Sequence, residues 1–76
     1  MSGSGPPLTR VMLGVRGMDT DGAREKVLRA VAGLPGVASV DAAGAQQLLV
    51  QYDAGEVTVM DLIRAVRRVG FLAGMV

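Results

Sequence analysis

Large apolar residues alternate with small or polar ones at the start of the chain. Within residues 8–15, Val11, Leu13 and Val15 alternate with Arg10, Met12 and Gly14, which is the two-residue period of a strand with one buried face. Gly17 ends this segment. Thr20 or Asp21 can then cap a helix, because its side-chain oxygen accepts a backbone amide that the first turn leaves unpaired. We therefore predict a strand followed by a helix.

The next apolar positions follow a helical period. They recur at steps of four, three, one and three, which puts them on one side of a helix. The members of this stripe are Ala23, Val27, Ala30, Val31 and Leu34. Leu34-Pro35-Gly36 should end the helix, because proline cannot continue it and glycine relaxes the turn.

The pattern returns to strands in the middle of the chain. Residues 37–42 predict a second strand, residues 43–45 interrupt it, and residues 46–52 resume strand character, with apolar and polar side chains on opposite faces. These two runs predict an antiparallel hairpin. A loop at residues 53–55 follows.

A second helix should begin at Thr58, which has Asp61 three residues later, the spacing of a capping box. Its inner stripe comprises Val59, Leu62, Ile63, Val66 and Val69. Arg67 and Arg68 fall in the last turn, where positive charge offsets the helix dipole, and Gly70 is placed to terminate the helix. Residues 71–76 can form a last strand.

The predicted order is strand, helix, strand, strand, helix, strand. This order is typical of an α+β, ferredoxin-like βαββαβ sandwich, in which two helices cover one face of a four-stranded antiparallel sheet. We assign residues 8–76 to this single domain. Residues 1–7 are rich in Gly, Ser and Pro, which predicts a flexible amino-terminal tail.

The composition excludes several classes of function, although it says less about the fold. The chain has 76 residues, half of them hydrophobic, and a net charge of +1, so it is one small globular domain with no excess charge for nucleic acid. One Phe and one Tyr offer no platform for stacking bases. No apolar run approaches the roughly 20 residues that span a bilayer. We expect a soluble, cytoplasmic protein.

The chain lacks the side chains that most catalytic sites use. It contains no Cys and no His, no nucleophile paired with a base, and no Gly-rich phosphate loop ending in Lys. We therefore expect a protein that is not an enzyme.

Several short motifs resemble one known family. In chain order they are Val15-Arg16-Gly17-Met18, Leu34-Pro35-Gly36-Val37, Val50-Gln51-Tyr52-Asp53 and Val69-Gly70-Phe71-Leu72-Ala73. Together they make the chain from Thr9 to Met75 resemble the heavy-metal-associated domain. This is the module of small copper chaperones and of the amino-terminal extensions of metal-pumping ATPases.

The resemblance implies a metal-binding loop, but its ligands are missing. In the family the loop is Gly-Met-x-Cys-x-x-Cys, whose two thiolates hold a soft ion such as Cu(I). The corresponding segment here is Gly17, Met18, Asp19, Thr20, Asp21, Gly22 and Ala23. Thr20 and Ala23 occupy the two ligand positions, and neither supplies a soft donor. We interpret the segment as a helix cap and expect no bound metal cofactor.

Carboxylates and thioethers are two other kinds of metal ligand in this sequence. Asp19 and Asp21 do not match a calcium loop, because its first and twelfth positions would be Gly17 and Leu28. Thioethers of Met12, Met18 or Met75 are soft donors for Cu(I). We expect Met18 instead in the core.

The remaining candidates for function are basic side chains predicted to lie on the surface. Six basic residues are candidates for docking on an acidic partner domain: Arg16, Arg24, Lys26, Arg64, Arg67 and Arg68. The alternative is that they are ordinary solvated faces of amphipathic helices. An exposed edge strand at residues 37–42 offers backbone pairing to a partner or a second copy, so we expect a monomer or a weak dimer.

Three functions stay open at this point. The first is a degenerate heavy-metal-associated-like domain that acts as a non-catalytic interaction or regulatory module, in a larger parent protein or beside a protein partner of metal (copper) transport. The second is a copper-binding and transfer domain whose cysteines were replaced by engineering or whose methionines bind the metal. The third is a designed or structural scaffold without a ligand.

Overall fold

The computed structural model describes residues 8–76, and the tail predicted at residues 1–7 lies outside them. The elements are β1 (Thr9–Arg16), α1 (Asp21–Ala32), β2 (Val37–Gly44), β3 (Gln47–Tyr52), α2 (Val59–Arg68) and β4 (Leu72–Met75). Their order is the one predicted from the apolar pattern.

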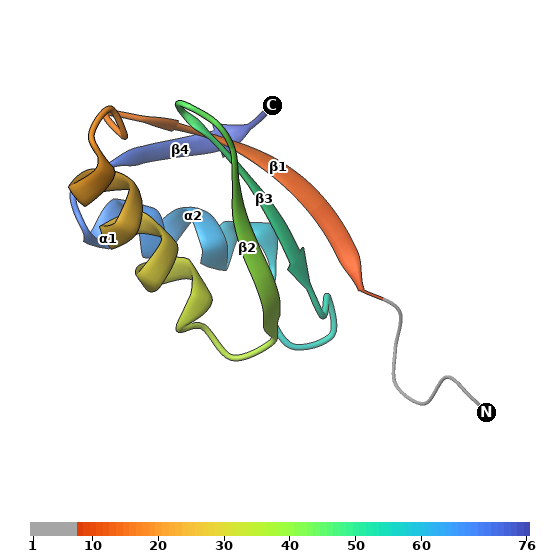
Figure 1. Cartoon of the computed structure of the whole chain (residues 1–76). Coiled ribbons are helices and arrows are strands. Elements are labelled where there is room, and N and C mark those ends of the chain that lie inside the picture. The colour runs from red at the N-terminus through yellow and green to blue at the C-terminus, as the bar shows by residue number, and fades with distance from the viewer. Residues whose placement is uncertain (1–7) are drawn as a thin grey trace.

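The four strands form one antiparallel sheet with the order β2-β3-β1-β4. Both helices lie on the same side of this sheet (Figure 1), which confirms the ferredoxin-like arrangement. β2 is an edge strand, as predicted, and β4 is the other edge. Within residues 8–76, no helix or second sheet covers the opposite face of the sheet (Figure 1).

The core lies between the sheet and the helices. Leu13 of β1 pairs with Leu48 of β3, and both side chains are fully buried. The predicted helical stripes contribute Val27 and Val31 from α1 and Leu62 and Val66 from α2, all fully buried. Four other predicted stripe residues are partly exposed and pack against this core: Leu34, Val59, Ile63 and Val69. Ala23 and Ala30 are also partly exposed.

Several boundaries differ from the prediction by one or two residues, and three of these differences have a cause in the hydrogen bonds or the strand register. α1 ends at Ala32, because the amide of Leu34 already donates to Val31 in a tighter turn before the proline. β2 continues to Gly44, because a register shift after Ala42 absorbs the small residues expected to interrupt it. β4 begins only at Leu72, because the amide of Phe71 still donates to a carbonyl of α2.

No helix within residues 8–76 is long and apolar enough to cross a membrane. The Phe71 ring lies beside the loop between β1 and α1, since one of its carbon atoms is 3.3 Å from the position that a Cβ at Gly17 would occupy. This packing fixes the loop against the carboxyl end of the chain.

Candidate functional site

The loop between β1 and α1 turns sharply at Gly17. Its φ of +90° lies in the left-handed region that favours glycine, and the turn sends the next side chain inward. Met18 is fully buried in the core, as predicted. The loop thus keeps a well-defined entry into the helix.

Thr20 caps α1, and its capping bond joins the two positions at which the resemblance places metal ligands. Its extended backbone (φ −116°, ψ 161°) precedes the first helical residue, and its Oγ1 accepts a hydrogen bond from the amide of Ala23 at 3.1 Å. The carbonyl of Thr20 accepts from the amide of Arg24 at 2.9 Å. The predicted cap is confirmed, and the hydroxyl that would face an ion is engaged by the helix.

The carboxylates beside the cap do not form a ligand cluster. Asp21 accepts a hydrogen bond from Nη1 of Arg24 at 3.0 Å, and its side chain is fully exposed. Asp19 is also exposed. Among residues 8–76 no three acidic side chains come together in a way that could hold a metal ion. An arginine therefore occupies the place beside Asp21 that a cation would take.

The three candidate thioethers are dispersed. Met75 pairs with Leu13, whose side chain faces the core, whereas Met12 is the neighbour of Leu13 in β1 and so points to the opposite face of the sheet. Met18 is buried under the loop. The described fold does not bring these sulfur atoms to one site.

The six predicted docking residues occupy separate regions of the surface. Arg16 lies on the uncovered face of the sheet, where it lines a hollow with Leu72 and Gly74. Arg24 turns toward Asp21 and is about one-third exposed. Lys26 lines a groove along α1 that ends at Val69. These three residues do not continue into one basic face.

The other three docking residues do gather. Arg64, Arg67 and Arg68 of α2 are exposed and line one hollow. Arg64 lies 3.9 Å from Oδ1 of Asp61, the carboxylate that caps the same helix. The predicted basic surface is thus divided, and α2 carries its densest part.

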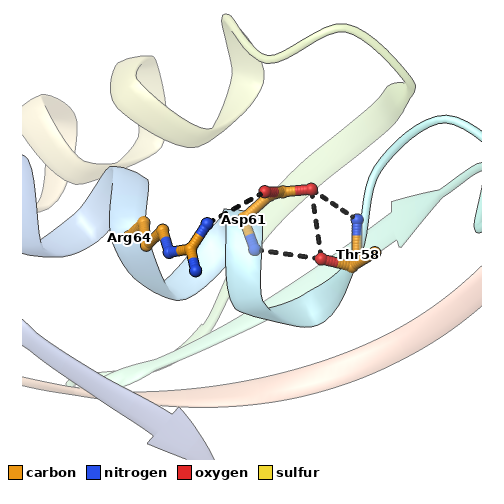
Figure 2. A network of polar contacts seen from close by, with 3 residues as sticks. All are labelled: Thr58, Asp61 and Arg64. Carbon is orange, nitrogen blue, oxygen red and sulfur yellow. Dashed lines mark hydrogen bonds and ion pairs between the residues drawn. The ribbon is translucent and has the colours of Figure 1, made fainter.

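Figure 2 shows the cap of α2 next to this surface. Oδ2 of Asp61 accepts hydrogen bonds from the amide of Thr58 at 3.0 Å and from its hydroxyl at 3.1 Å, while the amide of Asp61 donates to the hydroxyl oxygen at 3.2 Å. The bonds from the amide and then the hydroxyl of Thr58, with a smaller effect of Arg64, lower the pKa of Asp61. The predicted capping box is confirmed.

A hollow of about 200 Å³ beside α2 was not predicted from the sequence. It lies where the turn after α1 meets the loop before α2, over Leu34, Pro35, Val57 and Ala65. The sequence offers little indication of this hollow, because Ala65 is a small residue and the hollow depends on how the turn after α1 packs beside α2. The pairing of Asp21 with Arg24 was also missed, although their i, i+3 spacing could have revealed it.

The comparisons with known proteins agree with this geometry. The model of the heavy-metal-associated domain family matches residues 13–71, so the chain belongs to this family. Comparison with curated proteins gave no match.

Solved structures of similar fold include proteins of metal handling. Oxidized MerP from Ralstonia metallidurans CH34 is 26% identical, with a TM-score of 0.84 over 90% of this chain and 96% of that chain. The CopZ metallochaperone is 28% identical, with a TM-score of 0.81 over 87% and 100% of the two chains. The yeast copper transporter domain CCC2A is 25% identical, with a TM-score of 0.79 over 88% and 93%. The chain is thus a heavy-metal-associated domain without cysteine, related to proteins of copper and metal transport.

Proposed function

We propose that this chain is a degenerate heavy-metal-associated domain that acts as a non-catalytic interaction or regulatory module in metal transport, without holding a soft ion. Its partner is another protein, or a larger parent protein, of copper handling in the cytoplasm. The observation that carries the proposal is the bond from the amide of Ala23 to Oγ1 of Thr20 at 3.1 Å. A helix cap takes the place of a thiolate pair.

The chemistry of the loop supports this proposal. A hydroxyl is a hard and weak ligand at neutral pH, and the alanine methyl group is no donor. The helix amino-terminus that would stabilise a thiolate instead lies next to exposed carboxylates at positions 19 and 21. The scaffold around the loop, including buried Met18, is retained. Because the packing around the loop is retained while the metal-binding donor atoms are absent, we favour a role in which the surface of the domain binds a partner.

A Cu(I) titration tests the proposal directly. The protein is titrated under reducing conditions against a chromogenic Cu(I) chelator, with CopZ as the positive control. We expect the chelator to keep all the copper. Stoichiometric uptake with submicromolar affinity would refute the proposal.

The retained loop geometry favours one second candidate, a copper-transfer domain whose cysteines have been replaced. The double variant Thr20→Cys with Ala23→Cys restores the family's ligand pair at two positions already joined by a hydrogen bond. If only the donors were lost, this variant should take up one Cu(I), and either single variant should bind it far more weakly. A folded double variant that binds no copper would show that the loop has diverged in shape as well.

A further inference from the structure

Two adjoining hollows run along the outer side of α2. One, of about 200 Å³, lies over Leu34, Val57 and Ala65, and the carboxylates of Glu56 and Asp61 also line it. The other, of about 300 Å³, is lined by arginines alone, Arg64, Arg67 and Arg68. Arg64 and Arg68 line both hollows, so the two lie side by side. We call them together the α2 cleft.

The apolar end of the α2 cleft is built on tightly packed backbone. The amide of Asp53 donates to the carbonyl of Gly36 at 2.8 Å, which ties the loop before α2 to the turn after α1. Any side chain at Gly36 would start 2.8 Å from Cβ of Glu56. The two segments therefore hold a fixed shape, as in binding sites that are formed before the ligand arrives.

The ion pairs of the two helices do not include every arginine of the α2 cleft. On α1, Arg24 pairs with Asp21 at 3.0 Å and Arg29 lies 3.9 Å from Glu25. On α2, Asp61 already accepts bonds from Thr58. Within the described residues, Arg67 and Arg68 have no ion pair.

We propose that the α2 cleft docks an acidic protein segment that carries one aliphatic side chain. The aliphatic group fills the apolar hollow, and carboxylates beside it bind the planar guanidinium groups of Arg67 and Arg68, which suit carboxylates. Exposed Glu56 lines the far end of the cleft, so the acidic residues must lie toward the carboxyl end of α2. The inference rests on the proposed role as an interaction module and names its surface and class of partner.

Other ligands fit the cleft less well. Inorganic phosphate or a nucleic acid backbone would use the arginines but leave the hollow over Leu34, Val57 and Ala65 unfilled. A basic segment would meet three arginines. The combination of charge and apolar surface therefore selects an acidic segment with an aliphatic anchor.

Chemical-shift mapping by NMR of the ¹⁵N-labelled full chain tests this inference, because it detects weak binding and locates it. The probe is the peptide acetyl-Glu-Glu-Leu-Glu-Glu-amide, and a peptide with Ser in place of Leu and inorganic phosphate serve as comparisons. We expect saturable shifts at Val57, Ala65 and residues 64–68 with the Leu peptide. The Ser peptide should bind several-fold more weakly.

Variants of matched charge sharpen the test. Arg68→Gln should weaken binding about tenfold through the loss of one arginine–carboxylate contact, whereas Arg29→Gln removes the same charge from α1 and should leave the affinity unchanged. Glu56→Gln should strengthen binding. The amide spectrum of each variant reports whether it is folded.

Three outcomes would overturn the inference: no shifts at millimolar peptide, equal affinity for the Leu and Ser peptides, or binding of phosphate as tight as that of the Leu peptide. Shifts centred on Arg16, Arg24 and Lys26 would also overturn it, but would leave the proposed function standing. The proposed function itself fails only in the Cu(I) titration, so the two failures are distinguishable.

Discussion

Gly36 and Gly22 show how differently two glycines serve this chain. Gly36 has a φ of +92°, and a Cβ there would lie 2.8 Å from Cβ of Glu56. Gly22 lies in the first turn of α1, where an added Cβ would have no heavy atom within 4 Å. One glycine is required by the backbone and its close approach, while the other only weakens a helix.

Alanine at each position should therefore change stability in opposite directions. Gly36→Ala should lower the free energy of unfolding by at least about 1–2 kcal/mol, because the left-handed conformation disfavours a side chain and the contact adds strain. Gly22→Ala should raise it by about 0.5–1 kcal/mol. Urea unfolding followed by circular dichroism measures both. Equal stability of the two variants would contradict the assigned turn.

Single residues also show the limits of the sequence analysis. The burial of Met18 and the cap at Thr20 could be predicted, because each depends on its immediate neighbours and on the resemblance. The contact of Arg24 with Asp21 changes what the loop offers to a cation; the i, i+3 spacing allows this pair, but only the side-chain positions show that it forms. Features that depend on the backbone conformation, such as a helix cap, were therefore predictable from the sequence. Contacts between side chains were less predictable.

At the scale of elements, the two helix caps differ in one respect that pH can reveal. α2 begins with a full capping box, in which Asp61 bonds back to Thr58, whereas α1 has Ala23 at the corresponding position and only the bond to Thr20. The amide and hydroxyl of Thr58 hold the pKa of Asp61 below its ordinary value of 3.8. The folded carboxylate is thus more acidic than the unfolded one.

The direction of the pH dependence of stability follows from the difference between the folded and unfolded pKa of Asp61. The contribution of Asp61 to stability is fully present above about pH 4 and is lost as the pH falls through the lowered folded value. Thr58→Ala removes the hydroxyl and should cost about 1 kcal/mol at neutral pH. The stability gap between the wild type and this variant should narrow as Asp61 becomes protonated.

Urea unfolding from pH 7 down to about pH 3 checks this prediction, since that range covers the unfolded carboxyl pKa. Thr20→Ala is the matched control, because it removes the cap of α1 without touching a capping carboxylate. The difference in free energy of unfolding between Thr20→Ala and the wild type should stay constant as the pH falls. A gap that narrows equally in both variants would show that the capping box of α2 has no special pH dependence.

Elements and their order could be predicted from apolar periodicity, but some of their ends could not. α1 ends before Pro35 because the chain tightens at Leu34, and β2 continues through Ala43 because a bulge accommodates it. The α2 cleft was beyond prediction for a related reason. It is formed by the turn after α1, the loop before α2 and α2 itself, which only the tertiary fold brings together.

At the scale of the whole molecule, the sheet has one long open edge. β2 has eight residues, and Asp41 is its one charged side chain, while the opposite edge β4 has four residues. Register shifts near both ends of β2 twist part of the edge away from pairing. Charge and bulges are the devices by which natural sheets avoid edge-to-edge association. The predicted balance between monomer and weak dimer therefore depends on a few features of β2.

Neutralising Asp41 should shift this balance toward association. In Asp41→Asn the edge loses its only charge, so pairing of β2 with β2 of a second copy no longer places two carboxylates in one sheet. Glu25→Gln changes the net charge of the chain by the same amount but lies on α1, away from the edge. Sedimentation equilibrium over a range of protein concentrations should show stronger dimerisation for Asp41→Asn than for Glu25→Gln. If both variants associate to the same extent, net charge rather than the β2 edge controls self-association.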